Sequence, residues 1–289
     1  MEFDLNPAMA SPPNSNTVVF SITKSGKVAL WVASAIFALT WAGLLLVSFK
    51  APARKRAFFY LGALINFIGA INYYHMAAGK GWTWVSQPPL SWHENPQNVY
   101  PFRQVFHQHY IDWSAAMFLN MFQIGLLSGM SWVNIGFIVF GSQALSQTGW
   151  IAALSADNSR KFLWWGSSWL FVAWVAYMLL VVGRRDVKRQ HERVGIFYTP
   201  IALGAFVLLC AYPLNLLFAE GLNISSVDTE QIAYSVFDIF AKSGFGIALA
   251  SVDFLCEGEF TLALIPDTWV EPRSKTGVVE LSGPDYLSA

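Results

Sequence analysis

Charged residues are scarce in this chain. Lys, Arg, Asp and Glu together make up 12% of its 289 residues, whereas a soluble domain usually carries about 25%. That deficit excludes an ordinary soluble fold. The formal net charge is zero, so the chain lacks the basic excess that attracts nucleic acid, and we expect no nucleic-acid partner.

Cysteines and enzyme signatures are also in short supply. The two cysteines are Cys210 and Cys256. The sequence has no CxxC pair, no phosphate-binding glycine loop and no nucleophile elbow, so zinc fingers and the commonest nucleotide-binding and hydrolase folds have no support. We expect a protein that is not an enzyme.

Apolar residues are abundant, at 55% of the chain. They gather in seven stretches, each near the roughly 20 residues that a helix needs to cross a bilayer. The stretches cover residues 28–49, 57–78, 105–127, 132–154, 162–183, 194–219 and 231–256. The sequence therefore predicts an all-α membrane protein. It should be a bundle of seven transmembrane helices in the lipid bilayer, with the plasma membrane as its location.

Basic residues predict how this bundle is oriented. They cluster at 54–56 and 184–193, in two loops on the same side of a seven-helix bundle, and basic loops stay in the cytoplasm. The N-terminus is then outside and the C-terminus cytoplasmic. Arg160 and Lys161, expected in an outer loop before the fifth stretch, go against this trend.

Three regions follow from the same pattern. Residues 1–25 are polar and predict a flexible extracellular tail, residues 26–256 form the seven-helix domain, and residues 257–289 form a cytoplasmic tail. The longest outer loop, residues 79–104, combines prolines with tryptophans. We expect it to form an ordered hairpin that caps the outer face.

Three ionisable residues are expected at mid-depth, where a lone charge is costly. They are Asp112 in the third stretch and Asp238 and Lys242 in the seventh. Asp238 and Lys242 are four residues apart, so they share one face of a helix. One interpretation is a structural ion pair. The other is a reactive amine, because burial favours a neutral lysine, which condenses with an aldehyde to a Schiff base.

Four motifs resemble those of the microbial rhodopsins, most closely the fungal opsins. They are YIDW at 110–113, WW at 164–165, AYP at 211–213 and DIFAKSGFG at 238–246. They fall in the family's helix order, and the resemblance covers roughly residues 25–256. It implies all-trans retinal as a cofactor, bound to Lys242 through a Schiff base. It also implies Asp112 as primary counterion and proton acceptor, with Asp238 as its partner.

The resemblance further implies a set of aromatic residues around the retinal. Trp113, Trp165 and Tyr212 would line the polyene, and Tyr74 would lie near the Schiff base and Asp238. Flat rings on either side of a conjugated chain restrict which double bond rotates. For any one of the 13 tryptophans, the alternative is packing in the core or against lipid.

Positions along the expected proton path give mixed indications. Glu220 and Glu230 match the family's pair of proton-release glutamates, and the alternative is two solvated loop acids. Gln123 stands where pumps of the family carry a carboxylic proton donor. A glutamine cannot give up a proton, so the return of a proton to the Schiff base should be slow.

Four further positions depart from the family pattern. Ala116 replaces a threonine, Phe118 replaces a proline, and Leu209 and Leu216 replace two tryptophans of the pocket. The first change removes a hydroxyl partner from Asp112. The last two open space beside the polyene.

His109 replaces the family's arginine one turn before Asp112. Arginine keeps its charge, whereas histidine changes charge near neutral pH, so the support for an ionised Asp112 should depend on pH. His75 and His107 are expected in the same outer half. A metal site at these three histidines stays open as an alternative, although we expect none.

Three functions stay open. Light-driven proton translocation with a slow photocycle fits Asp112 and the two glutamates, and we favour it. A sensory photoreceptor or a weakly conducting light-gated protein fits the missing donor at Gln123, and a sensor would need a cytoplasmic signalling partner. A retinal-free opsin-like protein is disfavoured by Lys242. Dimers and trimers are common in the family, and the sequence does not choose between them.

Overall fold

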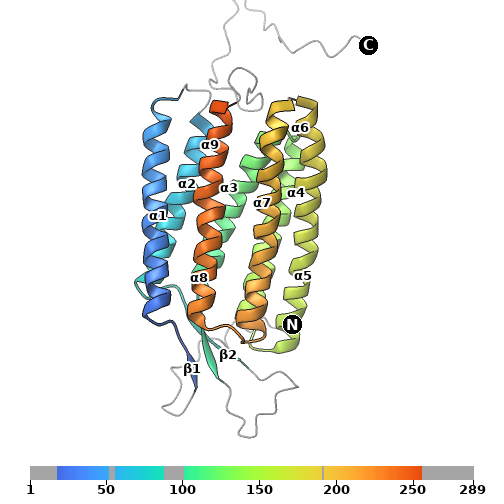
Figure 1. Ribbon diagram of the computed structural model, residues 1–289. Coiled ribbons are helices and arrows are strands. Elements are labelled where there is room, and N and C mark those ends of the chain that lie inside the picture. The colour runs from blue at the N-terminus through green and yellow to red at the C-terminus, as the bar shows by residue number, and fades with distance from the viewer. Residues whose placement is uncertain (1–17, 52–55, 88–100, 191, 256–289) are drawn as a thin grey trace, which may run out of the picture.

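The computed structural model describes residues 18–51, 56–87, 101–190 and 192–255. Within them the chain forms seven helical rods with a small sheet at one end (Figure 1), which confirms the predicted seven-helix bundle. The expectations for most of the two tails, residues 1–17 and 256–289, and for the middle of the long loop, residues 88–100, lie outside the described residues.

Four rods are single helices, and three join α-helices to short π-helical segments. The single helices are α1 (Lys24–Ser48), α2 (Arg56–Ala77), α3 (Gln108–Ser128) and α4 (Trp132–Leu154). The fifth rod joins α5 (Asn158–Tyr177), η2 (Met178–Gly183) and α6 (Arg184–Gln190). The sixth joins α7 (Glu192–Leu216) to η3 (Leu217–Gly221). The seventh joins α8 (Val227–Asp238), η4 (Ile239–Gly244) and α9 (Phe245–Leu255).

Capping residues set where several helices begin and where α3 ends. Ser131, Asp157 and Ser226 precede α4, α5 and α8, and each accepts a backbone hydrogen bond from the residue three positions on. Such caps satisfy an amide group that a helix start leaves unpaired. At the end of α3, Gly129 takes a φ of 68°, the left-handed conformation that suits glycine at a helix end.

The rods pack side by side in a closed ring. Each contacts the next along the chain, and α8 contacts α1. Asp228, in the first turn of α8, fastens this closure. Its Oδ1 accepts from the backbone N–H of Thr23 at 2.8 Å and of Gly26 at 3.2 Å, and its Oδ2 accepts from the Thr23 hydroxyl at 2.6 Å. A carboxylate there also meets the positive end of the α1 dipole.

The outside of the ring suits lipid. Among the described residues, the five rods that contain α1, α2, α5, α7 and α8 are long and apolar enough to span a membrane by themselves. The other two helices, α3 and α4, are of similar length, and α3 buries the polar Asp112, Asn120 and Gln123 on its inner side. Polar groups therefore gather inside, while large apolar side chains such as Leu39 and Leu170 are exposed on the outside.

The sheet lies at the end of the bundle where α1 and α8 begin (Figure 1). Its strands are β1 (Val19–Phe20), β2 (Thr83–Ser86) and β3 (Phe102–Val105), in the order β1-β3-β2. β2 and β3 are antiparallel, with Thr83 opposite Val105 and Ser86 opposite Phe102. The described ends of the long loop thus pair as a hairpin, as the sequence predicts.

Lys161 corrects one expectation about the loops. It lies in the first turn of α5, not in a loop, and it is 0% exposed. Its Nζ donates to Oε1 of Gln87 at 2.7 Å and to the backbone oxygen of Glu220 at 2.8 Å. Lys161 therefore links α5 to two other segments inside the protein. Because its charge is buried, it does not indicate which side of the membrane this end of α5 faces. The orientation of the bundle stays a prediction.

Candidate functional site

Lys242 lies at the centre of the bundle between two carboxylates. Its Nζ donates hydrogen bonds to Oδ2 of Asp112 in α3 and, at 2.7 Å, to Oδ2 of Asp238 in α8. All three side chains are at most 1% exposed. The structure therefore brings together the three charges that the sequence places at mid-depth.

The two carboxylates have different surroundings. Asp238 accepts hydrogen bonds from three further groups, the hydroxyls of Tyr73 and Tyr212 and the indole N–H of Trp113. The donor–acceptor distances are 2.5 to 3.1 Å. Asp112 accepts one further bond, from Nδ2 of Asn72 at 3.3 Å. Because hydrogen bonds favour the charged form of a carboxylate, Asp112 is the easier of the two to protonate.

The backbone around Lys242 is irregular. Lys242 belongs to η4, a π-helical segment in which carbonyl groups leave the α-helical pattern. Amides from two other rods reach these carbonyls. Asn66 Nδ2 donates to the oxygen of Lys242 at 3.3 Å, and Asn120 Nδ2 donates to that of Ala241 at 3.0 Å. These bonds hold the segment that carries Lys242.

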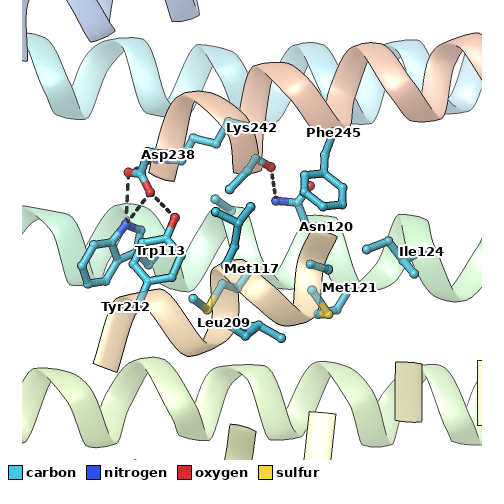
Figure 2. A pocket seen from close by; sticks show the side chains of 14 residues that line it. Trp113, Met117, Asn120, Met121, Ile124, Leu209, Tyr212, Asp238, Lys242 and Phe245 are labelled. Carbon is cyan, nitrogen blue, oxygen red and sulfur yellow. Dashed lines mark hydrogen bonds and ion pairs between the residues drawn. The ribbon is translucent and has the colours of Figure 1, made fainter. Parts of the chain in front are cut away.

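A pocket extends from Lys242 between α3 and α7 (Figure 2). Trp113 and Tyr212 lie at one end of it beside Asp238. Its wall continues with the apolar residues Met117, Met121, Ile124, Leu209 and Phe245. The cavity that these residues enclose has a volume of about 40 Å³. It is an apolar, aromatic slot with an amine near one end.

Tyr73 belongs to this site and Tyr74 does not. Tyr74 is 52% exposed, and its ring packs edge-on against Trp31 on the outside of the bundle. Tyr73 is 0% exposed and donates to Asp238. The expectation for Tyr74 was wrong because neighbouring helical residues point about 100° apart, so a shift of one position turns a side chain from the interior to the lipid.

Trp165 lies behind the pocket wall. Its indole N–H donates to the backbone oxygen of Pro213 at 2.9 Å, and its ring meets Trp169 edge-on. This hydrogen bond links α5 to α7 at Pro213, the residue that follows Tyr212. Trp113 and Tyr212 line the pocket that contains Lys242, and Trp165 supports it from outside.

His109 is enclosed by aromatic rings. Its imidazole stacks on Trp113 with ring centres 5.2 Å apart, and the rings of Tyr73 and Tyr234 lie 5.4 and 5.3 Å away. Its Nε2 lies 2.7 Å from Oε1 of Gln231. An amide oxygen only accepts, so Nε2 carries a proton, while Nδ1 has no partner among the described residues. The hydrogen bond of the ring thus leads to α8 and not to Asp112.

Glu220 and Glu230 are each 1% exposed, so neither is a solvated loop acid. Glu230 pairs with Arg103 of β3, whose Nη2 lies 2.6 Å from Oε2. The other oxygen of Glu230 accepts from Gln231 at 3.2 Å. A hydrogen-bonded chain therefore runs from His109 through Gln231 and Glu230 to Arg103.

Arg103 is completely buried and uses its remaining donors on the loop before α8. Its Nη1 donates to Oδ1 of Asn223 at 2.9 Å and to the backbone oxygen of Ser225 at 3.0 Å. Asn223 has a φ of 55°, a left-handed conformation that asparagine tolerates better than most residues. Together with Lys161, Arg103 places two buried cations beside the two glutamates.

Gln123 lies in α3, toward the end of the bundle away from the sheet. It is 0% exposed, and neither its amide nitrogen nor its amide oxygen has a partner among the described residues. A buried polar group without a partner costs about 1–3 kcal/mol. A carboxamide there cannot supply a proton to Lys242.

The three outer histidines do not converge. His75 is exposed on α2, His107 is half-buried just before α3, and His109 points inward. Across the described ranges, no group of three or more His, Cys, Asp or Glu side chains is arranged to hold a metal ion.

Sequence reasoning missed several polar partners in and around this site, namely Asn72, Tyr73, Arg103 and Gln231. Helical spacing could have found the first two, because Asn66, Gly69, Asn72 and Tyr73 recur on one buried face of α2. Arg103 gave no such signal, since a strand of four residues does not reveal which of its faces is buried.

Solved structures with the same architecture define the class of protein. A light-driven proton pump, LR (Mac), from Leptosphaeria maculans matches with a TM-score of 0.79 and 26% identity, covering 84% of this chain and 100% of that one. The light-driven proton pump CsR from Coccomyxa subellipsoidea matches with a TM-score of 0.75 and 29% identity, covering 81% and 99%. The class is that of the microbial rhodopsins, which are transporters or photoreceptors and not enzymes.

Sequence relatives lead to the same family. Opsin-1 of Neurospora crassa is 29% identical over 236 residues, 79% of this chain and 77% of that protein. The opsin-like protein carO of Fusarium fujikuroi is 26% identical over 246 residues, 85% and 78%. The family model described as bacteriorhodopsin-like protein matches residues 25–254. The chain belongs to the bacteriorhodopsin-like family, and it is an integral membrane protein that crosses the bilayer several times.

Proposed function

We propose that the protein binds all-trans retinal covalently at Lys242 and uses light to move protons across the membrane in a slow cycle. The observation that carries the proposal is the position of Lys242, a buried amine held by two carboxylates in an apolar pocket. Location in the plasma membrane and assembly into dimers or trimers are further expectations from the resemblance.

The residues of the pocket fit this cofactor. Lys242 offers an amine to an aldehyde, and the carboxylates beside it balance the charge that stays on Nζ. Trp113 and Tyr212 offer flat surfaces to a conjugated chain, and Met117 and Met121 are flexible side chains that adapt to its shape. When bound, retinal supplies the absorption of visible light and the light-driven change of shape.

Proton transfer follows from the unequal support of the two carboxylates. Asp238 keeps its charge, because two tyrosines and a tryptophan donate to it. Asp112, which among the described residues has Asn72 as its donor besides the lysine, accepts the proton that leaves Nζ of Lys242. In the structure, Nζ donates directly to Oδ2 of Asp112, so the transfer would need no intermediate group.

Glu220 is the better candidate for the outer proton-release group. Arg103 and Gln231 donate to both oxygens of Glu230, and such hydrogen bonds support the charged form of a carboxylate. Glu220 has weaker support, a contact of 3.4 Å between its Oε2 and the Tyr110 hydroxyl. The two glutamates that the resemblance assigns to proton release thus differ in how strongly hydrogen bonds support their charged forms.

A sensory function is the second candidate, and Gln123 favours it. Without a carboxylic donor at this position, the proton returns to Lys242 slowly, and a long-lived deprotonated state is what a signalling partner needs. A sensor would complete its cycle without net proton transport.

Light-induced pH change distinguishes the two functions. Cells that express the protein with retinal are illuminated in unbuffered suspension, with and without a protonophore. Translocation predicts a pH change that the protonophore abolishes and that is absent from cells expressing Lys242→Ala. A photocycle in the purified protein without any pH change in cells would contradict translocation and support sensing.

A further inference from the structure

An apolar groove lies between the sixth and seventh rods, on the outside of the bundle. Its lining includes Pro200, Gly204 and Val207 of α7 and, facing them, Phe240, Gly244 and Ala248 of the seventh rod. Val207 is 63% exposed and Phe240 is 60% exposed. In a membrane protein such a surface meets the acyl chains of the bilayer.

This groove shares a wall with the pocket that contains Lys242. Leu208 and Phe245 line both spaces, and both side chains are partly buried. Figure 2 shows Phe245 next to Asn120 on the inner side of this wall. At this level a single layer of side chains separates the bilayer from the pocket.

The helices beside this wall are suited to local opening. Pro200 removes a backbone hydrogen bond from α7, and η4 interrupts the α-helix of the seventh rod. Gly204 faces Phe245 and has no side chain. A Cβ added at Gly204 would lie 3.5 Å from Cζ of Phe245. The Phe245 ring therefore meets no side chain at position 204.

The route from the end that carries the sheet is less suitable for an apolar molecule. It leads past the buried charges of Arg103, Glu230 and Glu220. An apolar ligand would have to displace these groups from their partners, and breaking a buried ion pair costs about 3–5 kcal/mol. A side route through hydrocarbon avoids that cost.

We propose that the groove between α7 and α9 is the portal through which retinal passes from the bilayer into the pocket, with Leu208 and Phe245 as its movable wall. This inference rests on the proposed binding of retinal at Lys242. A hydrophobic polyene is concentrated in the bilayer, where it meets the exposed groove.

The test measures how fast pigment forms when retinal is added to retinal-free protein in lipid bilayers. Gly204→Leu fills the portal and supports the Phe245 ring from outside. Its matched control is Gly43→Leu, which fills a second outer groove lined by α1 and α9 residues, where an added Cβ has no neighbour within 4 Å. Both changes replace a helical glycine by the same good helix former.

We expect Gly204→Leu to slow the rise of the visible band roughly tenfold, the effect of about 1.4 kcal/mol on a barrier, while Gly43→Leu forms pigment at the wild-type rate. Phe245→Ala, which thins the wall, should speed it. Equal rates for Gly204→Leu and Gly43→Leu would overturn the portal and leave the groove as a site for a lipid chain.

Two further outcomes are decisive. If Gly204→Leu forms no pigment after synthesis but forms it when retinal is present during synthesis, the portal is blocked in a folded protein. If it forms none under either condition, the rate of Phe245→Ala decides, and a rate no faster than wild type overturns the proposal. A wild-type protein that forms no visible band contradicts retinal binding itself, and the portal falls with it.

Discussion

Asp112 and Asp238 are chemically identical, and in the proposed function their different neighbours give them different tasks. Asp238 has donors from α2, α3 and α7, which fix a negative charge beside Lys242. Asp112 has one amide donor, from Asn72, and remains free to take up a proton. The same difference in hydrogen-bond support recurs at Glu230 and Glu220.

Tyr73 contributes to stability through its hydrogen bond to Asp238, and its neighbour Tyr74 provides the control. We expect Tyr73→Phe to lower the free energy of unfolding by about 1.5–3 kcal/mol, the contribution of a hydrogen bond to a charged group. Tyr74→Phe, on the outside, should change it by about 0.5 kcal/mol or less. Thermal unfolding in detergent, followed by circular dichroism, measures both. Equal losses of stability in Tyr73→Phe and Tyr74→Phe would contradict the assignment of Tyr73, in place of Tyr74, to the site.

His109 should make the colour of the pigment sensitive to acid. A charged Asp112 stabilises the ground state of the cofactor more than its excited state, so protonation of Asp112 shifts absorption to the red. Arginine keeps its charge and histidine does not, so in His109→Arg the acid-induced red shift should occur at a lower pH than in the wild type. His75→Arg, at an exposed site on α2, is the control. A midpoint unchanged in His109→Arg would show that this position does not support Asp112.

Gln123 should limit the speed of the cycle. Gln123→Asp places a proton donor on α3, and we expect the proton to return to Lys242 roughly 100-fold faster, as a positioned acid typically achieves. Flash photolysis at the wavelength of the deprotonated pigment measures the decay, and azide should accelerate it in the wild type. If neither changes the decay, another step is slow.

At the scale of elements, helices were predictable and the polar contacts between them were not. Apolar runs of spanning length give the seven rods, because the bilayer fixes their length. To predict which tyrosine contacts Asp238, one must know which face of α2 is buried. A single motif residue did not give this helical phase, so Tyr74 was predicted in place of Tyr73. Lys161 and Arg103 look like loop charges in the sequence, and only the packing of β3 and α5 against η3 and α8 shows that they are buried.

The strand β3 joins the bundle through Arg103 and Glu230, and this pair should behave as a unit. We expect Arg103→Gln to lower the free energy of unfolding by about 3–5 kcal/mol, because it leaves Glu230 buried without its cation. The double variant Arg103→Gln with Glu230→Gln removes both charges and should be more stable than Arg103→Gln alone. Thermal unfolding of the single and double variants tests the pair. Strictly additive losses would show that the two charges do not interact.

At the scale of the whole molecule, the ring of helices separates an apolar outside from a polar interior. Seven rods surround a line of charged and amide groups that runs from Arg103 near the sheet, through Glu230 and His109, to Lys242. Beyond Lys242 the line continues as the amides of Asn120 and Gln123, which carry no charge. The bundle therefore has ionisable groups on one side of Lys242 and a carboxamide at Gln123 on the other, and the slow cycle that we propose rests on this asymmetry.

The visible spectrum of the Lys242→Ala variant tests the central claim most directly. Wild-type protein and Lys242→Ala are prepared without retinal, supplied with all-trans retinal and compared, with Lys80→Ala, at an exposed lysine, as the control. We predict a visible band in the wild type and in Lys80→Ala, and only the absorption of free retinal in Lys242→Ala with its helical content unchanged. A normal coloured pigment from Lys242→Ala would contradict the account.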